Sequence, residues 1–377
     1  MDKTKLYFKN LDSIRFFAAF IVFVEHAVSP AYKYLPIQGT YFMKILNVFS
    51  DGGIGVSIFF VLSGFLITYL LLCEYELNSK ISLKNFYMRR ILRIWPLYFF
   101  VVLFSFFIYP LLKNFGGMNN SLSSSVMYYF TFLSNFDVIH VHKYFTGNDA
   151  LSQNITWSVS VEEQFYLFWP LLFVFLPKKY WKFSIFSVII CSLLFRIFHF
   201  NDTIVLYYHT FSVLIDLGLG AIMASLIKSH QKIKLFFENI STRTHILLFS
   251  FSFGMILWGN RLFDFDFGPA IVRFFISFSF ALIISAQAFT TKLSILNLGR
   301  LSFPSTWGKY TYGIYLLHPI IITFWDVVYR VIGIPKTGFI SLFSIALFSF
   351  VLTLVISKFS FLYFESKFLA LKERFTS

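Results

Sequence analysis

Residues 11–28 read LDSIRFFAAFIVFVEHAV, an apolar stretch long enough to cross a bilayer. It carries two groups that are costly in hydrocarbon, the guanidinium of Arg15 and the imidazole of His26. Eleven positions separate them, which is close to three turns of an α-helix, so both side chains share one face. They lie about 16 Å apart along the helix axis. We therefore expect a membrane helix with a cation near one side and a potential base near the other.

Each of these two residues also has a simpler interpretation. Arg15 can extend toward the lipid headgroups or pair with Asp12, three positions earlier on the same face. His26 can be a hydrogen-bonded histidine at the membrane surface. Two ionisable groups on one face of one helix favour a functional role over both alternatives.

The whole chain has the composition of a membrane protein. Of its 377 residues, 57% are hydrophobic and 13% are charged, whereas soluble domains carry about 25% charged residues. We predict an all-α integral membrane protein with about ten transmembrane helices. The expected spans are 11–28, 55–73, 94–112, 156–176, 183–199, 205–226, 244–260, 270–289, 311–332 and 339–362.

The distribution of Lys and Arg predicts the orientation of these spans. The termini and the connections on their side hold 22 of the 32 Lys and Arg residues, and the opposite connections hold six. The other four are Arg15, Arg196, Arg273 and Arg330, within predicted helices or near their ends. The positive-inside rule therefore places both termini in the cytoplasm. The net charge of +14 forms no free basic stripe, so we expect no nucleic-acid partner.

The chain is expected to consist of one domain. Residues 1–365 form the transmembrane domain, residues 366–377 form a short cytoplasmic tail, and no appended soluble domain is expected. We expect the first segment to be retained rather than cleaved as a signal peptide. Residues 126–136 are apolar but too short to cross, so they are expected to be re-entrant or interfacial. Cys73 and Cys191 lack metal-ligand spacing, and no metal is expected.

A basic cluster precedes the third expected span. Arg90 and Arg93 share a helical face at a spacing of three, and Trp95 follows them. A cationic anchor and an interfacial tryptophan explain part of this pattern. The alternative is a clamp for a cytoplasmic phosphorylated cofactor, because guanidinium groups match phosphate oxygens. The spacing alone leaves both interpretations open.

An acidic cluster lies near the start of the fourth expected span, where residues 157–166 read WSVSVEEQFY. Two carboxylates inside a membrane helix are costly unless they line a wet or protein-lined cavity. Glu162 and Glu163 diverge by about 100°, so only one is expected to face such a cavity. The alternative is that they complement the helix dipole. A carboxylate on the side of His26 would orient the imidazole and stabilise its protonated form.

Two further groups of residues are candidates for the same site. Gly53 and Gly55 open the second expected span and could shape a turn beside a cavity, or simply allow close helix packing. Tyr312, Tyr315 and His318 recur every three residues in the ninth span, just before a proline. A packing histidine beside a proline kink is the alternative to a pocket role for this group.

Five segments in this order resemble motifs of the membrane-bound acyltransferase-3 family, whose members acylate bacterial surface polysaccharides. They are residues 11–26, 53–65, 90–96, 157–166 and 308–319. The resemblance implies transfer of an acyl group, usually acetyl, from cytoplasmic acetyl-CoA or another acyl-CoA to a hydroxyl of a surface or lipid-linked glycan. It also implies a multi-pass protein of the bacterial inner membrane, in contact with membrane lipid.

The residues and the resemblance together predict a site. His26 is expected to act as general base, with Glu162 or Glu163 orienting it, and Arg15 to hold the donor or a carboxylate such as Asp12. Arg90, Arg93 and Trp95 are expected to bind the donor. Direct transfer is preferred to an acyl-enzyme. The expected pocket residues are Asp12, Gly53, Gly55, Ser57, Trp157, Ser160, Tyr166, Tyr312, Tyr315 and His318.

One departure and one rival function remain. Ser57 stands where many relatives carry Asp, which leaves its polar role open. A transporter or flippase for a glycan or lipid would use intramembrane Arg, His and Glu equally well. Ester formation on a surface glycan separates the enzyme from the carrier.

Overall fold

The computed structural model describes residues 7–28, 51–115, 124–144, 152–291, 296–334 and 339–375. Within these ranges every regular element is a helix, which confirms the all-α prediction. The α-helices are α1 (Lys9–Val28), α3 (Gly52–Asn78), α4 (Leu83–Leu103), α5 (Tyr109–Phe115), α6 (Val126–Phe130), α7 (Ser134–Tyr144), α8 (Thr156–Phe175), α9 (Trp181–Phe198), α10 (Thr203–Tyr208), α11 (Thr210–Ser229), α12 (Gln231–Glu238), α13 (Thr242–Leu262), α14 (Gly268–Phe289), α15 (Ser302–Trp307), α16 (Thr311–Ile332), α17 (Phe339–Ser360) and α18 (Ser366–Leu371).

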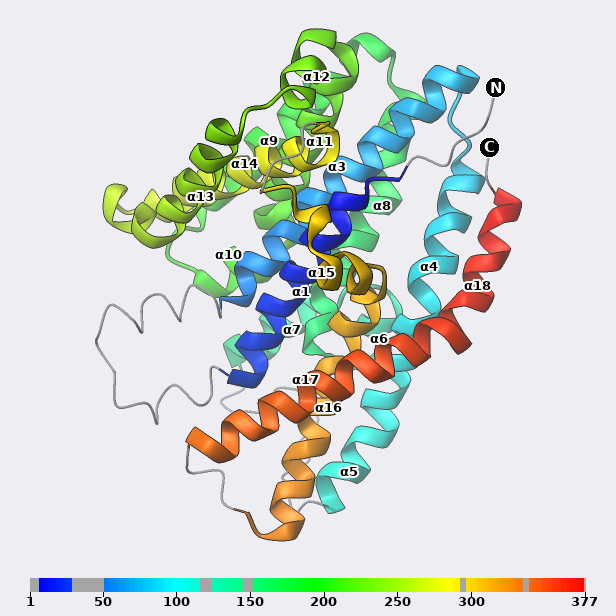
Figure 1. Cartoon of the computed structure of the whole chain (residues 1–377), viewed down its shortest axis with the longest axis vertical. Coiled ribbons are helices and arrows are strands. Elements are labelled where there is room, and N and C mark those ends of the chain that lie inside the picture. Colours follow the sequence, from blue (N-terminus) through cyan, green and yellow to red (C-terminus); the bar gives the residue numbers. More distant parts are fainter. Residues whose placement is uncertain are drawn as a thin grey trace.

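Helices α1, α3 and α11 form the centre of the bundle, with α3 packed against both of the others. Figure 1 shows α1 and α3 running side by side through the middle of the molecule. Glycines allow this approach: a Cβ on Gly64 would lie 1.9 Å from Leu217 O, and one on Gly220 would lie 2.0 Å from Val61 O. Small residues at a membrane helix interface let two backbones pack closely, so α3 and α11 meet at these two positions.

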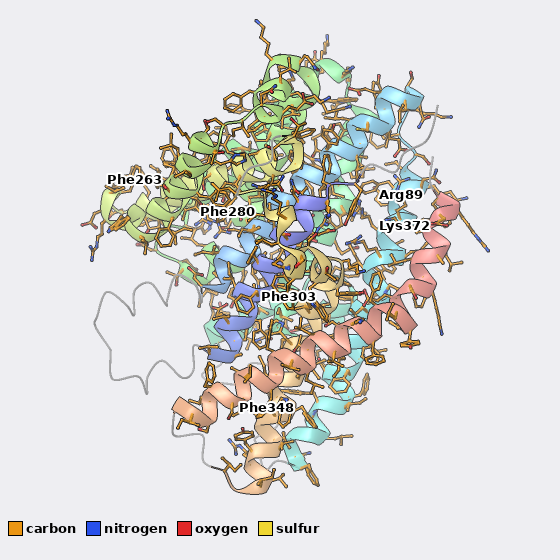
Figure 2. The ribbon with its side chains drawn as sticks, in the orientation of Figure 1. Arg89, Phe263, Phe280, Phe303, Phe348 and Lys372 are labelled. Carbon is orange, nitrogen blue, oxygen red and sulfur yellow. The ribbon has the colours of Figure 1, made fainter. Side chains whose placement is uncertain are left out.

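The outer helices present their apolar side chains to the surroundings. The apolar window of α3 is 72% buried, whereas that of the span containing α9 is 28% buried. Phe303 and Phe348, both labelled in Figure 2, are exposed. A surface this rich in exposed phenylalanine is suited to lipid rather than to water.

Seven helices of the described ranges are long and apolar enough to cross a membrane. The count becomes eight if the bent pair α12 and α13, which meet at 95°, forms one span. The prediction of about ten spans with both termini in the cytoplasm therefore stays a prediction.

Two expected spans outside this count, α1 and α8, carry the candidate residues Arg15, His26, Glu162 and Glu163. Each has 20 residues, enough to cross the hydrocarbon. However, α1 contains Asp12, Arg15 and Glu25, and α8 contains Glu162 and Glu163. Both helices pack against α3 inside the bundle, so their polar groups meet protein as well as lipid.

The segment that was expected to be re-entrant or interfacial forms two short helices, α6 and α7. A turn joins them at Phe132, whose φ is 55°. Tyr129 in α6 is fully buried, and its carbonyl accepts a hydrogen bond from the Tyr98 hydroxyl at 2.9 Å. Gln164 of α8 donates to Phe132 O at 2.8 Å. The segment is therefore packed onto α4 and α8.

The carboxy-terminal helix α18 and the turn after it pack against α4 near its start. Figure 1 shows α18 beside α4, and Figure 2 labels Arg89 and Lys372 close to each other at this contact. Arg89 donates to Phe375 O at 2.8 Å and pairs with Glu74 at 2.9 Å. One guanidinium thus joins α3, α4 and the carboxy-terminal turn.

Candidate functional site

Two histidines meet at the end of the bundle where α1 ends and α3 and α8 begin, which we call the His26 end. His26 is exposed, whereas His318 of α16 is fully buried behind it. The His318 Nε2 atom lies 3.4 Å from His26 Nδ1, and the ring centroids are 5.2 Å apart. The structure thus joins two candidate residues that are 292 positions apart in the chain.

Backbone carbonyls determine which nitrogen of each ring is available. His26 Nδ1 lies 2.8 Å from Val22 O, and His318 Nδ1 lies 3.0 Å from Ile314 O. In its neutral form each ring therefore carries its proton on Nδ1, because a carbonyl can only accept a hydrogen bond. Among the described residues nothing donates to Nε2 of His26, so its lone pair is available, as a general base requires.

Other candidate residues surround the histidine pair. The Tyr315 ring is 6.3 Å from that of His318, and its hydroxyl lies 2.6 Å from Ser158 Oγ. Gly55 faces α1, where a Cβ would lie 2.5 Å from Ala18 O, so this glycine supports close helix packing. The α1–α3 contact holds His26 beside the start of α3.

The opposite end of α1 lies where α3 ends and α4 begins, and we call it the Arg15 end. Arg15 NH1 donates to Asp12 Oδ1 at 2.5 Å, and Asp12 is 2% exposed. The Tyr7 hydroxyl donates to the other oxygen of Asp12, and this hydrogen bond raises the pKa of Tyr7 to about 12. The structure therefore pairs Arg15 with Asp12, which is one of its two expected roles.

Arg90 and Arg93 of the basic cluster, and Arg89 directly before them in α4, have different partners. Arg89 is held by Glu74 and Phe375. The Arg90 guanidinium lies over the rings of Phe86 and Tyr166, 5.8 and 5.6 Å from their centroids, and its buried Nε has no hydrogen-bond partner among the described residues. Arg93 is exposed. Arg90 and Arg93 are therefore the members with capacity to bind a ligand.

The two carboxylates of α8 bind neighbouring side chains. Glu163 Oε2 accepts from Trp95 Nε1 at 2.9 Å, while its buried Oε1 has no hydrogen-bond partner in the described part of the chain. Glu162 Oε2 accepts from the Tyr166 hydroxyl at 2.8 Å, and this hydroxyl also contacts Ser63 Oγ. Glu163 therefore has a buried oxygen available for a ligand, whereas Glu162 is linked through the Tyr166 hydroxyl to Ser63.

This geometry differs from the sequence-based expectation in two ways. The acidic and basic clusters were expected near opposite sides of the membrane, but Trp95 and Glu163 bind each other directly. Arg90 and Glu162 each lie well inside their helices, so both clusters extend toward the middle of the bundle. Neither carboxylate hydrogen-bonds His26. The groups in contact with His26 Nδ1 are Val22 O and His318 instead.

The remaining predicted residues have structural partners. The Tyr312 hydroxyl donates to Ile94 O at 2.7 Å, which ties α16 to α4. Ser160 Oγ lies 2.7 Å from Ser134 Oγ of α7. The Trp157 ring packs edge-on against Phe60, with centroids 5.8 Å apart. These three contacts position α8 and α16 around the site.

Ser57 belongs to a buried polar cluster with Asp216, Arg273 and Ser277, which the sequence did not reveal. Its hydroxyl donates to Asp216 Oδ2 at 3.4 Å. Asp216 is fully buried, pairs with Arg273 at 2.5 Å and accepts from Ser277. A carboxylate thus stands beside position 57, although α11 supplies it. Arg196 and Arg273 were visible in the sequence as intramembrane cations, but no spacing signal connected them to Asp216.

The described residues contain no group of three or more His, Cys, Asp or Glu side chains that could hold a metal ion. What the site offers is acid–base and electrostatic chemistry. It has a free imidazole nitrogen at one end of α1 and two guanidiniums with ligand-binding capacity near the other end.

Comparisons with known proteins give a consistent result. The model of a family described as "Acyltransferase domain" matches residues 8–358. Peptidoglycan O-acetyltransferase OatA of Listeria monocytogenes is 39% identical over 163 residues, which cover 38% of this chain and 25% of that protein. A Bacillus subtilis protein named "Putative peptidoglycan O-acetyltransferase YrhL" is 26% identical over 363 residues, covering 86% and 52%.

A third relative, from Staphylococcus aureus, is named "Putative O-acetyltransferase" and is 30% identical over 293 residues, covering 73% of this chain and 47% of that protein. The chain thus spans about half the length, or less, of these relatives. No solved structure matches it.

Proposed function

This chain belongs to the acyltransferase-3 family, and we propose that it moves an acyl group, most simply acetyl, from acyl-CoA in the cytoplasm to a hydroxyl of a cell-envelope glycan. One relative is named "Peptidoglycan O-acetyltransferase" and another "Putative peptidoglycan O-acetyltransferase", which makes peptidoglycan, or its lipid-linked precursor, the first acceptor to test. In this proposal the His26 end faces the exterior of a bacterial inner membrane, and the Arg15 end faces the cytoplasm.

The observation that carries the proposal is the free Nε2 of His26. A general base must reach the hydroxyl that it deprotonates, and His26 is exposed at its end of the bundle. Its Nδ1 is held by Val22 O and lies beside His318, so the ring orientation is supported from behind. His26 therefore has both the free nitrogen and the access that proton removal needs.

The reaction proposed at His26 is a direct transfer. The acceptor oxygen attacks the thioester carbonyl carbon while His26 Nε2 takes the hydroxyl proton. The new C–O bond forms, the C–S bond breaks, and the protonated imidazole returns the proton to the departing coenzyme A thiolate. Direct transfer is preferred because no serine or threonine hydroxyl of the described residues hydrogen-bonds His26, as an acyl-enzyme formed on such a hydroxyl would require.

Donor binding is assigned to the cluster between α4 and α8. The guanidiniums of Arg90 and Arg93 would bind the phosphates of coenzyme A. Arg90 Nε and Glu163 Oε1 are buried without partners among the described residues, and buried polar atoms of this kind are usually hydrogen-bonded. A bound donor arm would supply those hydrogen bonds.

Reconstitution tests the function. The full chain in proteoliposomes receives acetyl-CoA on the Arg15 side and a glycan acceptor on the His26 side. We expect release of free coenzyme A that depends on the acceptor and produces an ester on it. Movement of glycan or lipid without ester formation would instead identify a carrier.

A further inference from the structure

A cavity of about 190 Å³ lies away from the histidine pair, between α3, α8, α9, α10 and α14. It could hold about six water molecules at ~30 Å³ each, and it is smaller than the ~300–1,000 Å³ sites that enclose whole ligands. The cavity therefore suits one group of a larger molecule. Its lining residues are Gly53, Val56, Trp157, Arg196, Thr203, Leu206, Tyr207 and Arg273.

Arg196 brings to this cavity a buried guanidinium that has no direct ion pair among the described residues. It is 6% exposed, and its NH1 donates only to neutral oxygens, Leu206 O at 3.0 Å and those of Ser212, with Oγ at 2.6 Å. Its Nε has no hydrogen-bond partner among the described residues. No carboxylate of the described chain forms an ion pair with it. A buried guanidinium in this state is costly, so an anionic partner would stabilise it.

The second guanidinium of the cavity is already neutralised. Arg273 binds Asp216 through two nitrogens, at 2.5 and 3.1 Å. The other carboxylates nearby are Asp51, which caps the amino terminus of α3, and Glu25 of α1, whose carboxylate lies against that terminus. Asp51 accepts from Gly53 N at 2.9 Å, and the Glu25 carboxylate packs onto Gly52, where a Cβ would lie 1.7 Å from Oε2. Both carboxylates thus lie at the amino terminus of α3, which favours negative charge, and neither forms an ion pair with Arg196.

Two aromatic rings complete the walls. The centroids of Trp157 and Tyr207 are 5.4 Å apart. Gly53 leaves the Tyr207 ring uncovered, since a Cβ there would lie 2.9 Å from Tyr207 Cε2. The negative face of an aromatic ring attracts the polarised C–H groups of a sugar. Rings beside a guanidinium therefore suit a sugar that carries a negative charge.

Two short chain segments link the wall of the cavity to the histidine pair. Glu25, next to His26 in α1, packs against Gly52, which precedes the cavity residue Gly53. On the other side, Trp157 is followed by Ser158, whose hydroxyl contacts Tyr315 beside the histidine pair. These links would let one sugar of a glycan occupy the cavity while another sugar of the same glycan reaches His26.

We propose that this cavity binds an oxyanion, carboxylate or phosphate, carried by the acceptor glycan, with Arg196 as its charge partner. The inference rests on the proposed function, because it places the acceptor of that reaction. It adds that the acceptor is acidic and that its charge is recognised away from the hydroxyl that receives the acyl group.

A binding experiment tests this without requiring acyl transfer. The purified full chain is titrated with glucuronate, glucose 1-phosphate and glucose, and binding is followed by saturation-transfer NMR. The informative variant is Thr203→Glu, with Thr203→Gln as its matched neutral control. Thr203 is exposed at the start of α10 and lines the cavity, so Glu there would supply an internal carboxylate without disturbing the packing.

We expect the unmodified chain to bind at least one anionic sugar about ten-fold more tightly than glucose. Thr203→Glu should abolish that preference, and Thr203→Gln should keep it. Arg196→Gln should also abolish it, whereas Arg261→Gln, an exposed arginine at the end of α13, should not. The comparison of glucuronate with glucose 1-phosphate identifies which oxyanion fits.

Equal binding of all three sugars, or no binding of any, would overturn the inference, as would an unchanged preference in Thr203→Glu. These results are separable from the proposed function. Acyl transfer to glycan with no anion preference removes only the cavity assignment. Anion preference without ester formation leaves the cavity as an anionic-sugar site and removes the acyltransferase proposal.

Discussion

His318 Nε2 lies 3.4 Å from His26 Nδ1, with His318 fully buried and His26 exposed. Each Nδ1 also faces the carbonyl oxygen four residues earlier in its own helix. The pair therefore presents one free nitrogen, Nε2 of His26, at the end of α1. The proposed chemistry depends on this asymmetry.

The first prediction concerns the base itself. His26→Gln should lower kcat for acyl transfer by at least about 100-fold, because general-base catalysis contributes ~10²–10⁴-fold. The variant should insert and melt as the unmodified chain does. His199→Gln is the control, since His199 is exposed and makes the same type of contact, Nδ1 to Phe195 O at 2.9 Å. Full activity of His26→Gln would remove His26 from the mechanism.

The second prediction treats His318 as a positioning residue. His318→Leu should reduce kcat by about ten-fold with little change in the KM for either substrate, because His26 loses the group behind its ring. His318→Gln keeps a polar atom in that place and should recover part of the loss. Steady-state kinetics on both variants decide the matter. If His318 only stabilises the fold, the loss of kcat in each variant should follow the drop in its melting temperature. That result would contradict a positioning role.

The third prediction separates the arginines. Arg93→Gln should raise the KM for acetyl-CoA by about ten-fold or more, since one charge-assisted phosphate contact is lost. The KM for acetyl-pantetheine, which lacks the nucleotide phosphates, should not change.

Arg89→Gln is the contrasting variant. It breaks the ion pair with Glu74 and the bond to Phe375 O, so it should lower the melting temperature and leave the ratio of the two donor KM values unchanged. Equal effects of both variants on that ratio would contradict the assignment of Arg93.

The fourth prediction distinguishes the two carboxylates of α8. Glu163→Gln should reduce transfer more than Glu162→Gln does, because Glu163 Oε1 is buried with no described partner, whereas Glu162 accepts from Tyr166. Trp95→Phe should resemble Glu163→Gln, since it removes the hydrogen bond that holds this carboxylate. Initial rates of acyl transfer, measured with saturating donor, rank the three variants. A larger loss in Glu162→Gln would reverse the assignment.

The fifth prediction tests the centre of the fold. Gly64→Ala should lower the free energy of unfolding by about 1–3 kcal/mol, because its Cβ would meet the Leu217 backbone at 1.9 Å. Gly254→Ala has nothing within 4 Å of its Cβ and should raise stability by up to about 1 kcal/mol. Thermal unfolding in detergent compares the two. Similar melting temperatures would indicate that α3 and α11 do not pack at Gly64.

Helix positions were predictable because hydrophobic runs and their ends are local properties. The expected span 311–332 coincides with α16, and 270–289 differs from α14 by two residues. The expected face shared by Arg15 and His26 also follows from local geometry. Hydropathy alone does not count α1 and α8 among the spans, because their charged residues reduce their apolar character.

Contacts between helices were not predictable in the same way. Periodicity shows which residues share a face, but it does not show which helix that face meets. Nothing in the sequence pairs Trp95 with Glu163, or Arg273 with Asp216, across 68 and 57 positions. The positions of the acidic and basic clusters along the membrane normal were also predicted wrongly. Each cluster was assigned to the nearer end of its helix, whereas Trp95 and Glu163 hydrogen-bond each other.

The most direct test of the central claim is the mass of the surface glycan from cells with and without this chain, alongside cells carrying His26→Gln. We expect an ester-linked acyl mass, acetyl in the simplest case, that requires the chain and disappears in the variant. The same glycan mass in all three strains would contradict the proposal that His26 serves acyl transfer to an envelope glycan.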